Sequence, residues 1–173
     1  MAMMSSQLDY SGVCILVTKA LEGELKQRLC IDFKAYLQKR YPFEIQYKEW
    51  PAALVKTGKS GLRKILSDND FTLGTVPFVC GFSKKYISSQ KYITNKKRVL
   101  EFSREQLFAP GMNEQQMEQA LNMISTEVEN ARTRYRNPAA HTNAIQKCTA
   151  DECLRKLIDI ERLLIKMLDL FAY

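Results

Sequence analysis

Apolar residues return along this 173-residue chain at the spacing of helices, and a long helix is expected over residues 10–40. One large apolar side chain recurs there at every fourth position: Leu21, Leu25, Leu29, Phe33 and Leu37. This stripe predicts packing on one side. Residues 13–17 are apolar on every side, as in a helix buried in a core or an interface. We expect the helix to end at Tyr41-Pro42, because proline disfavours a helical residue before it.

The middle of the chain predicts shorter elements. Short helices are expected at residues 52–56 and 61–66, with a polar break at 68–70. Residues 71–82 are apolar but contain Pro77, which indicates a short or kinked helix. Another helix is expected over residues 95–108, and it stops at the loop signal Ala-Pro-Gly that follows.

The helix expected over residues 113–135 has the clearest pattern. Its apolar positions alternate steps of four and three residues: Met117, Leu121, Ile124, Val128, Ala131 and Tyr135. This is a heptad seam with polar residues on the other face. Asn113 is expected to cap the start, followed by Glu114 in the first turn.

The last helix is expected to begin with a capping box at Thr149 and Glu152 and to continue to Phe171. One apolar stripe consists of Leu154, Leu157, Ile158, Leu164, Ile165, Leu168 and Phe171. A second consists of Ile160, Leu163, Met167 and Leu170. A helix that is apolar on two faces needs two partners, its own core and a second subunit. The pattern therefore predicts one all-α domain over residues 1–173, a helical bundle that dimerises through its long helices.

Composition narrows the classes of protein further. Hydrophobic residues make up 46% of the chain, without a run of 18 apolar residues, so we expect no membrane span. The five cysteines are scattered and form no C-x-x-C pair, and there is one histidine, so a zinc site is not expected. Reduced thiols and a start without signal-peptide features predict a cytoplasmic protein.

The net charge of +7 is concentrated in one segment. Residues 51–100 contain ten Lys or Arg and only two acidic residues, so the rest of the chain is close to neutral. Aromatic residues, Phe82, Tyr86 and Tyr92, lie among these basic residues. This mixture suits a polyanion with stackable bases, and a solvated lysine-rich surface is the other interpretation.

The only histidine lies in the hexapeptide RNPAAH, residues 136–141. The hexapeptide thereby brings three groups close together in the chain: a guanidinium that can hold phosphate, an amide, and an imidazole that can move protons. Asn137 before Pro138 predicts the end of one helix and the N-cap of another. His141 would then lie in a first helical turn, where backbone N–H groups favour a bound phosphate. Arg132 and Arg134 would add charge on the approach.

This hexapeptide, after a long amphipathic helix in an all-α chain, resembles the HEPN superfamily. The signature of that family is Arg, usually a polar residue, and then His after four to six intervening residues. Arg136, Asn137 and His141 match it with four between Arg and His. The resemblance implies a cofactor-free, metal-independent endoribonuclease that works as a homodimer in defence, toxin or stress systems, with an antitoxin or sensor partner. Asn143 stands where one toxin branch has a modified tyrosine, so control by that modification is not expected.

In the chemistry implied by the resemblance, the 2′-hydroxyl of single-stranded RNA attacks the adjacent phosphate. His141 would take or supply a proton, and Arg136 would hold the phosphate. Asn137 would orient either the histidine or the phosphate. The candidate RNA-binding residues are Arg132, Arg134, Lys84, Lys85, Lys91, Lys96, Lys97 and Arg98. One His does not easily serve as both acid and base, and a symmetric dimer would supply two.

Three alternatives compete with this interpretation. A non-catalytic HEPN module would bind RNA or dimerise as part of a larger effector. A helical adaptor would use His141 only for a hydrogen bond in its core. Gly58-Lys59-Ser60 resembles the end of a phosphate-binding P-loop, but the first glycine of that motif is replaced by Ala53. Nucleotide hydrolysis is therefore disfavoured.

Overall fold

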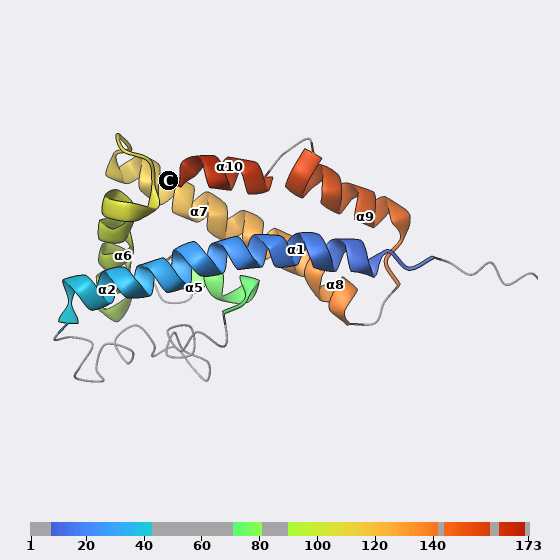
Figure 1. Ribbon diagram of the computed structural model, residues 1–173, viewed down its shortest axis with the longest axis horizontal. Coiled ribbons are helices and arrows are strands. Elements are labelled where there is room, and N and C mark those ends of the chain that lie inside the picture. Colours follow the sequence, from blue (N-terminus) through green and yellow to red (C-terminus); the bar gives the residue numbers. More distant parts are fainter. Residues whose placement is uncertain (1–7, 43–70, 81–89, 142–143, 160–162, 172–173) are drawn as a thin grey trace, which may run out of the picture.

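The structure is a computed structural model that describes residues 8–42, 71–80, 90–141, 144–159 and 163–171. Every regular element in these ranges is helical, and the only β-type pairing among them is an isolated bridge between Phe108 and Phe171. The helices lie side by side in an elongated bundle (Figure 1). The predicted all-α class is thus confirmed. None of the described helices is long and apolar enough to cross a membrane.

The first helix is continuous from residue 11 to residue 40, as predicted. It consists of α1 (Ser11–Lys26), a π-helical turn (Gln27–Asp32) and α2 (Phe33–Arg40), and Tyr41 leaves the helix with φ −132°. Steps of four residues overshoot one α-helical turn by about 40° each, so a stripe with this period would drift around the helix. A π turn has roughly 4.4 residues and reverses the drift. All five residues of the predicted stripe are consequently buried.

The second long helix runs from residue 114 to residue 140. It consists of α7 (Glu114–Ala131), a π-helical turn (Arg132–Arg136) and α8 (Asn137–Ala140). Asn113 caps it as predicted: its Oδ1 accepts from the Gln116 N–H at 2.9 Å, and the Gln116 side chain accepts from the Asn113 N–H at 2.8 Å. All six residues of the predicted heptad seam are buried.

The shorter elements lie across these two helices. A 3₁₀ turn (Leu73–Thr75) leads into α5 (Val76–Val79), which confirms the short helix predicted around Pro77. The helix α6 (Gln90–Phe102) continues through a π turn (Ser103–Leu107) before a loop in which Gly111 has φ +101°. The helices predicted at 52–56 and 61–66, the polar break at 68–70 and the P-loop-like tripeptide lie outside the described residues.

The last part of the chain begins its helix earlier than predicted. The helix α9 (Lys147–Leu154) is preceded by Gln146 as N-cap, and the Thr149 N–H donates to the Gln146 carbonyl at 3.1 Å. The predicted capping box at Thr149 is therefore wrong, because this residue already lies in the first turn. A π turn (Arg155–Asp159) follows, and α10 (Leu163–Leu170) ends the described chain.

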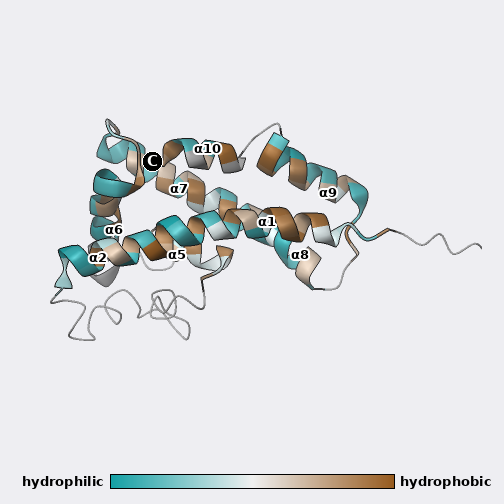
Figure 2. Ribbon diagram, viewed as in Figure 1, coloured by the Kyte–Doolittle hydropathy of each residue, from teal (hydrophilic) through white to brown (hydrophobic). Residues whose placement is uncertain are grey.

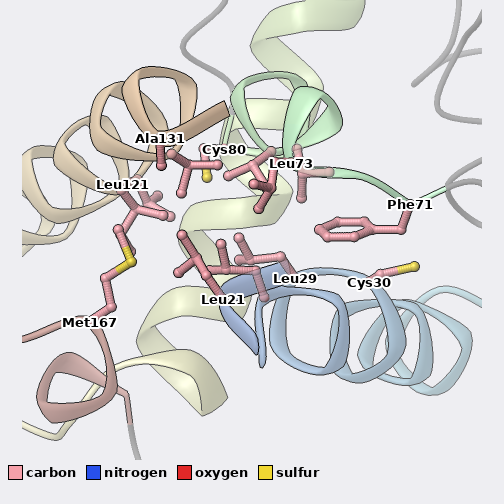
Figure 3. Close-up of a cluster of buried hydrophobic side chains, with 14 of the residues drawn as sticks. Leu21, Leu29, Cys30, Phe71, Leu73, Cys80, Leu121, Ala131 and Met167 are labelled. Atoms are coloured by element: carbon pink, nitrogen blue, oxygen red, sulfur yellow. The ribbon is translucent and has the colours of Figure 1, made fainter. Parts of the chain in front are cut away.

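The core lies between the first helix, α5, α7 and α10. Leu21 and Leu29 of the first helix converge there with Leu73 and Leu121, and Met167 closes one side (Figure 3). Met167 belongs to the second of the two apolar stripes of the last segment, and it is 1% exposed in the single chain. The core is therefore built from both stripes of the last segment.

The start of α1 is apolar all around, as predicted, and appears hydrophobic in Figure 2. The described part of the chain covers only one side of it. Cys14 is fully buried against the rest of the fold, whereas Leu16 is 71% exposed. The C-terminal part of the second helix and α9 both pack against α1, so this region adjoins the hexapeptide.

Candidate functional site at the end of α8

The hexapeptide lies at the end of a helix. Asn137 has helical dihedral angles, φ −67° and ψ −48°, and its side chain caps nothing, so its predicted role as an N-cap is wrong. His141 is the residue that ends the helix, with φ −111° and ψ 40°, and its N–H donates to the Asn137 carbonyl at 3.1 Å. Pro138 is tolerated because the π turn before it widens the helix where a proline ring would otherwise strike a carbonyl.

This position reverses the predicted electrostatics of the backbone. The end of a helix presents unpaired carbonyl groups and the negative pole of the macrodipole, which favour cations. The backbone next to His141 therefore does not form the phosphate cradle that the sequence suggested. Any phosphate bound here must be held by side chains.

Two of the three arginines in residues 132–136 are neutralised by carboxylates of the same chain. Arg132 forms two bonds to Glu129, from Nε to Oε2 at 2.7 Å and from Nη2 to Oε1 at 2.5 Å, which raise the pKa of the guanidinium. Arg134 Nη2 lies 2.7 Å from Glu152 Oε1 on α9. Because their charges are compensated, Arg132 and Arg134 make the approach to the motif less positively charged than the sequence predicted.

Arg132 is also held by packing. A Cβ built at Gly74 would lie 3.3 Å from the Arg132 Cδ, so the stem of the arginine covers this glycine closely. Arg132 thereby connects the second long helix to the 3₁₀ turn before α5. The contact points to a structural role for this arginine.

Arg136 differs from its two neighbours. Among the residues that the structure describes, it has no acidic partner, and its Nη1 donates only to Asn137 Oδ1, at 3.5 Å. The residue is half-buried. A partly buried guanidinium without a counter-ion is suited to bind an anion bidentately.

The three motif residues lie around α8, with His141 at its end. Asn137 and His141 are four residues apart, so they lie on the same face of the helix. Arg136 starts from a different face, and its long side chain curls toward Asn137. His141 is exposed to solvent. The amide thus accepts from the guanidinium on the helical face that also carries the imidazole.

The neighbouring Tyr135 does not add an acid or base at neutral pH. Burial, helped by the nearby Glu152 carboxylate, raises the pKa of Tyr135 to about 12. The phenol is 1% exposed and belongs to the core. Within the described ranges, no group of three or more His, Cys, Asp or Glu could hold a metal ion.

The basic residues of the middle segment whose side chains the structure describes are not brought to the motif. Lys96, Lys97 and Arg98 lie on α6, which packs against α2 at the opposite end of the molecule from α8 (Figure 1). Lys96 forms an ion pair with Glu118 at 2.8 Å. Lys84 and Lys85 lie outside the described residues, as does the side chain of Lys91.

The interactions of Arg98 are internal to its own end of the bundle. Its Nη1 bonds to Glu101 Oε2 at 3.1 Å, and its guanidinium lies 3.5 Å from the centre of the Tyr41 ring. Concentration of charge in the sequence did not indicate where each basic residue lies in the fold. Lys97 is exposed, and so it is the described lysine of this segment best placed to contact a polyanion.

No sequence pattern pointed to Asp9 and Ile145, which join the start of α1 to the chain just after the motif. Asp9 Oδ1 accepts from the Ile145 N–H at 3.1 Å. An Asp before a helix is a known capping signal. Its bond to a residue 136 positions away has no sequence signal.

Comparisons with known protein families, with curated proteins and with solved structures find no match to this chain. The resemblance to HEPN proteins therefore rests on the motif and on the helical context described above.

Proposed function

We propose that this protein is a metal-independent endoribonuclease that cleaves single-stranded RNA at the end of α8. The observation that carries the proposal is the state of Arg136. It is the one arginine of residues 132–136 without a carboxylate partner among the described residues, and it reaches the amide of Asn137, one helical turn before the only histidine. A guanidinium without a carboxylate partner among the described residues, in the same short segment as a proton carrier, is suited to phosphate-ester cleavage.

In the proposed reaction the 2′-hydroxyl attacks its own 3′-phosphate and the bond to the 5′-oxygen of the next nucleotide breaks. The hydroxyl loses a proton and the leaving oxygen gains one, so the products are a 2′,3′-cyclic phosphate and a 5′-hydroxyl. His141 moves one of these protons, and Arg136 neutralises charge on the phosphate. Asn137 orients the guanidinium through its Oδ1.

A second imidazole is needed for the other proton, and a homodimer would supply it. The partly uncovered start of α1, with Leu16 71% exposed, supports contact with another chain. A role in defence, as a toxin or in a stress response, with an antitoxin or sensor as partner, belongs to the same proposal and rests on the HEPN resemblance.

The test is cleavage of a labelled single-stranded RNA in EDTA by the wild type, His141→Ala and Arg136→Ala. Arg104→Ala is the matched control, because Arg104 is an exposed arginine paired with Glu114 at 2.9 Å outside the motif. We expect cleavage with cyclic-phosphate ends by the wild type and the control, and its loss in both motif variants.

Two results would contradict the proposal. Equal cleavage by all four proteins would place the activity elsewhere or in a contaminant. Salt-sensitive RNA binding without cleavage by a dimeric wild type would instead identify a non-catalytic RNA-binding module. Light scattering on the same samples gives the oligomeric state, and a monomer that cleaves RNA would remove the need for a second imidazole.

A further inference from the structure

One carboxylate oxygen joins the beginning of the fold to the segment that follows the motif. Asp9 Oδ1 accepts three hydrogen bonds: from the Ser11 N–H at 2.9 Å, from the Ser11 Oγ–H at 2.6 Å and from the Ile145 N–H at 3.1 Å. The Tyr10 N–H in turn donates to the Ile145 carbonyl at 3.1 Å. Both backbone groups of Ile145 are therefore bound to residues at the start of α1.

The side chain of Ile145 strengthens this attachment. It is 6% exposed and belongs to the hydrophobic core. A buried side chain and two paired backbone groups together fix the position of this residue, because its release would expose apolar area and unpair polar groups at once. Ile145 is thus an anchor for the chain between α8 and α9.

His141 lies between this anchor and the end of α8. On one side its N–H is bonded to the Asn137 carbonyl at 3.1 Å. On the other side Ile145 follows four residues later, and four residues of extended chain span at most about 14 Å. The described chain is therefore fixed on each side of His141, at Asn137 and at Ile145, and the second of these fixed points depends on Asp9.

The Asp9 carboxylate is well suited to this role in its ionised form. Its hydrogen bonds to Ser11 and Ile145 lower its pKa from the ordinary value of 3.8. At neutral pH its Oδ1 accepts from three donors. A side chain without an oxygen atom, such as alanine, could not accept these hydrogen bonds.

We propose that Asp9 is a positioning residue for His141, which it holds in place through Ile145. The proposal rests on the nuclease function proposed above, because it assigns Asp9 a part in placing the imidazole against RNA. Asp9 itself touches no reacting atom. A displacement of about 1 Å in a catalytic group costs up to about 100-fold in rate, so loss of one anchor is large enough to detect.

The test compares Asp9→Ala and Asp9→Asn with Asp151→Ala, an exposed aspartate on α9 outside the anchor. Because His141 is the only histidine, its ring Cε1–H signal in a ¹³C–¹H NMR spectrum reports on it alone. For Asp9→Ala we expect that signal to shift or broaden and kcat to fall about tenfold, with KM changed by less than about twofold. Asp9→Asn keeps an acceptor oxygen and should recover most of kcat.

An unchanged ring signal and unchanged kcat in folded Asp9→Ala would overturn the positioning role. If that variant does not fold, Ser11→Ala is measured instead, since it removes only the 2.6 Å bond. The two proposals fail separately. A wild type that does not cleave RNA would contradict the nuclease, whereas the NMR comparison would still show whether Asp9 holds His141.

Discussion

Arg134 and Glu152 connect the helix before the motif to the helix after it, with Arg134 Nη2 2.7 Å from Glu152 Oε1. The pair compensates the positive charge of Arg134, which the sequence predicted to bind RNA. It also fixes α9 against the π turn Arg132–Arg136, next to the site. In the proposed RNA complex, this ion pair and the phosphate would compete for the same arginine.

Glu152→Gln should release Arg134 for an RNA phosphate. The Arg134 side chain is 60% exposed, and such ion pairs contribute about 1 kcal/mol or less, so the loss of stability should be small. We expect RNA affinity at low salt to rise about two- to fivefold, with a steeper dependence on salt. Filter binding at several salt concentrations measures both. Glu114→Gln, which breaks the Arg104 pair and changes net charge equally, should raise the affinity less.

Arg136→Ala and Arg132→Ala should separate function from stability. Among the described residues Arg136 makes one long hydrogen bond, so its removal should change the free energy of unfolding by less than about 0.5 kcal/mol while cleavage is lost. Arg132 bonds twice to Glu129 and packs on Gly74. Its loss should cost about 1 kcal/mol and leave more activity. Urea unfolding and RNA cleavage are measured on the same samples. A larger loss of stability in Arg136→Ala, or a larger loss of cleavage in Arg132→Ala, would contradict this prediction.

The anchor made by Asp9 should weaken in acid. A carboxyl whose pKa is lowered by folding contributes stability above its unfolded value of 3.8, and this contribution disappears as pH falls through the lower folded pKa. The wild type should therefore exceed Asp9→Asn in stability at pH 7, and the difference should narrow below pH 3.8. Urea unfolding at both pH values measures it.

Cysteine labelling should distinguish one thiol from the other four. Cys148 is exposed, whereas Cys14, Cys30, Cys80 and Cys153 are buried. Burial raises the pKa of both Cys80 and Cys153 to about 12, so they hold almost no reactive thiolate at pH 8. Brief treatment of the folded protein with iodoacetamide should give one adduct by mass spectrometry, and five after unfolding in urea. Rapid labelling of Cys153 in the folded protein would show that α9 detaches from α1.

The helices were predictable because burial of a stripe depends on spacing within a short segment. Leu21 to Leu37 and Met117 to Tyr135 occupied the core as their periods indicated. The cap at Asn113 was equally local. The start of α9 was missed because it depends on the distant contact between Ile145 and Tyr10, which sets where the chain can turn into a helix.

The candidate site was only partly predictable for the same reason. The motif residues are close together in the chain, so the sequence identified them as a group. Asn137, however, was expected to cap a helix that in fact continues through it. A π turn made room for Pro138, and no residue pattern announces such a turn. The ion pairs that neutralise Arg132 and Arg134 depend on which carboxylates the fold brings within reach.

The sequence by itself determined the helical class, the buried faces of the two long helices and the group of residues that carries the candidate chemistry. These features follow from local periodicity and from residues adjacent in the chain. Only the tertiary structure decided that His141 ends a helix, that Arg136 alone of its neighbours lacks a carboxylate within the described ranges, and that Lys96 to Arg98 lie at the far end. Charge compensation and distance in space depend on contacts between remote segments, which local spacing does not encode.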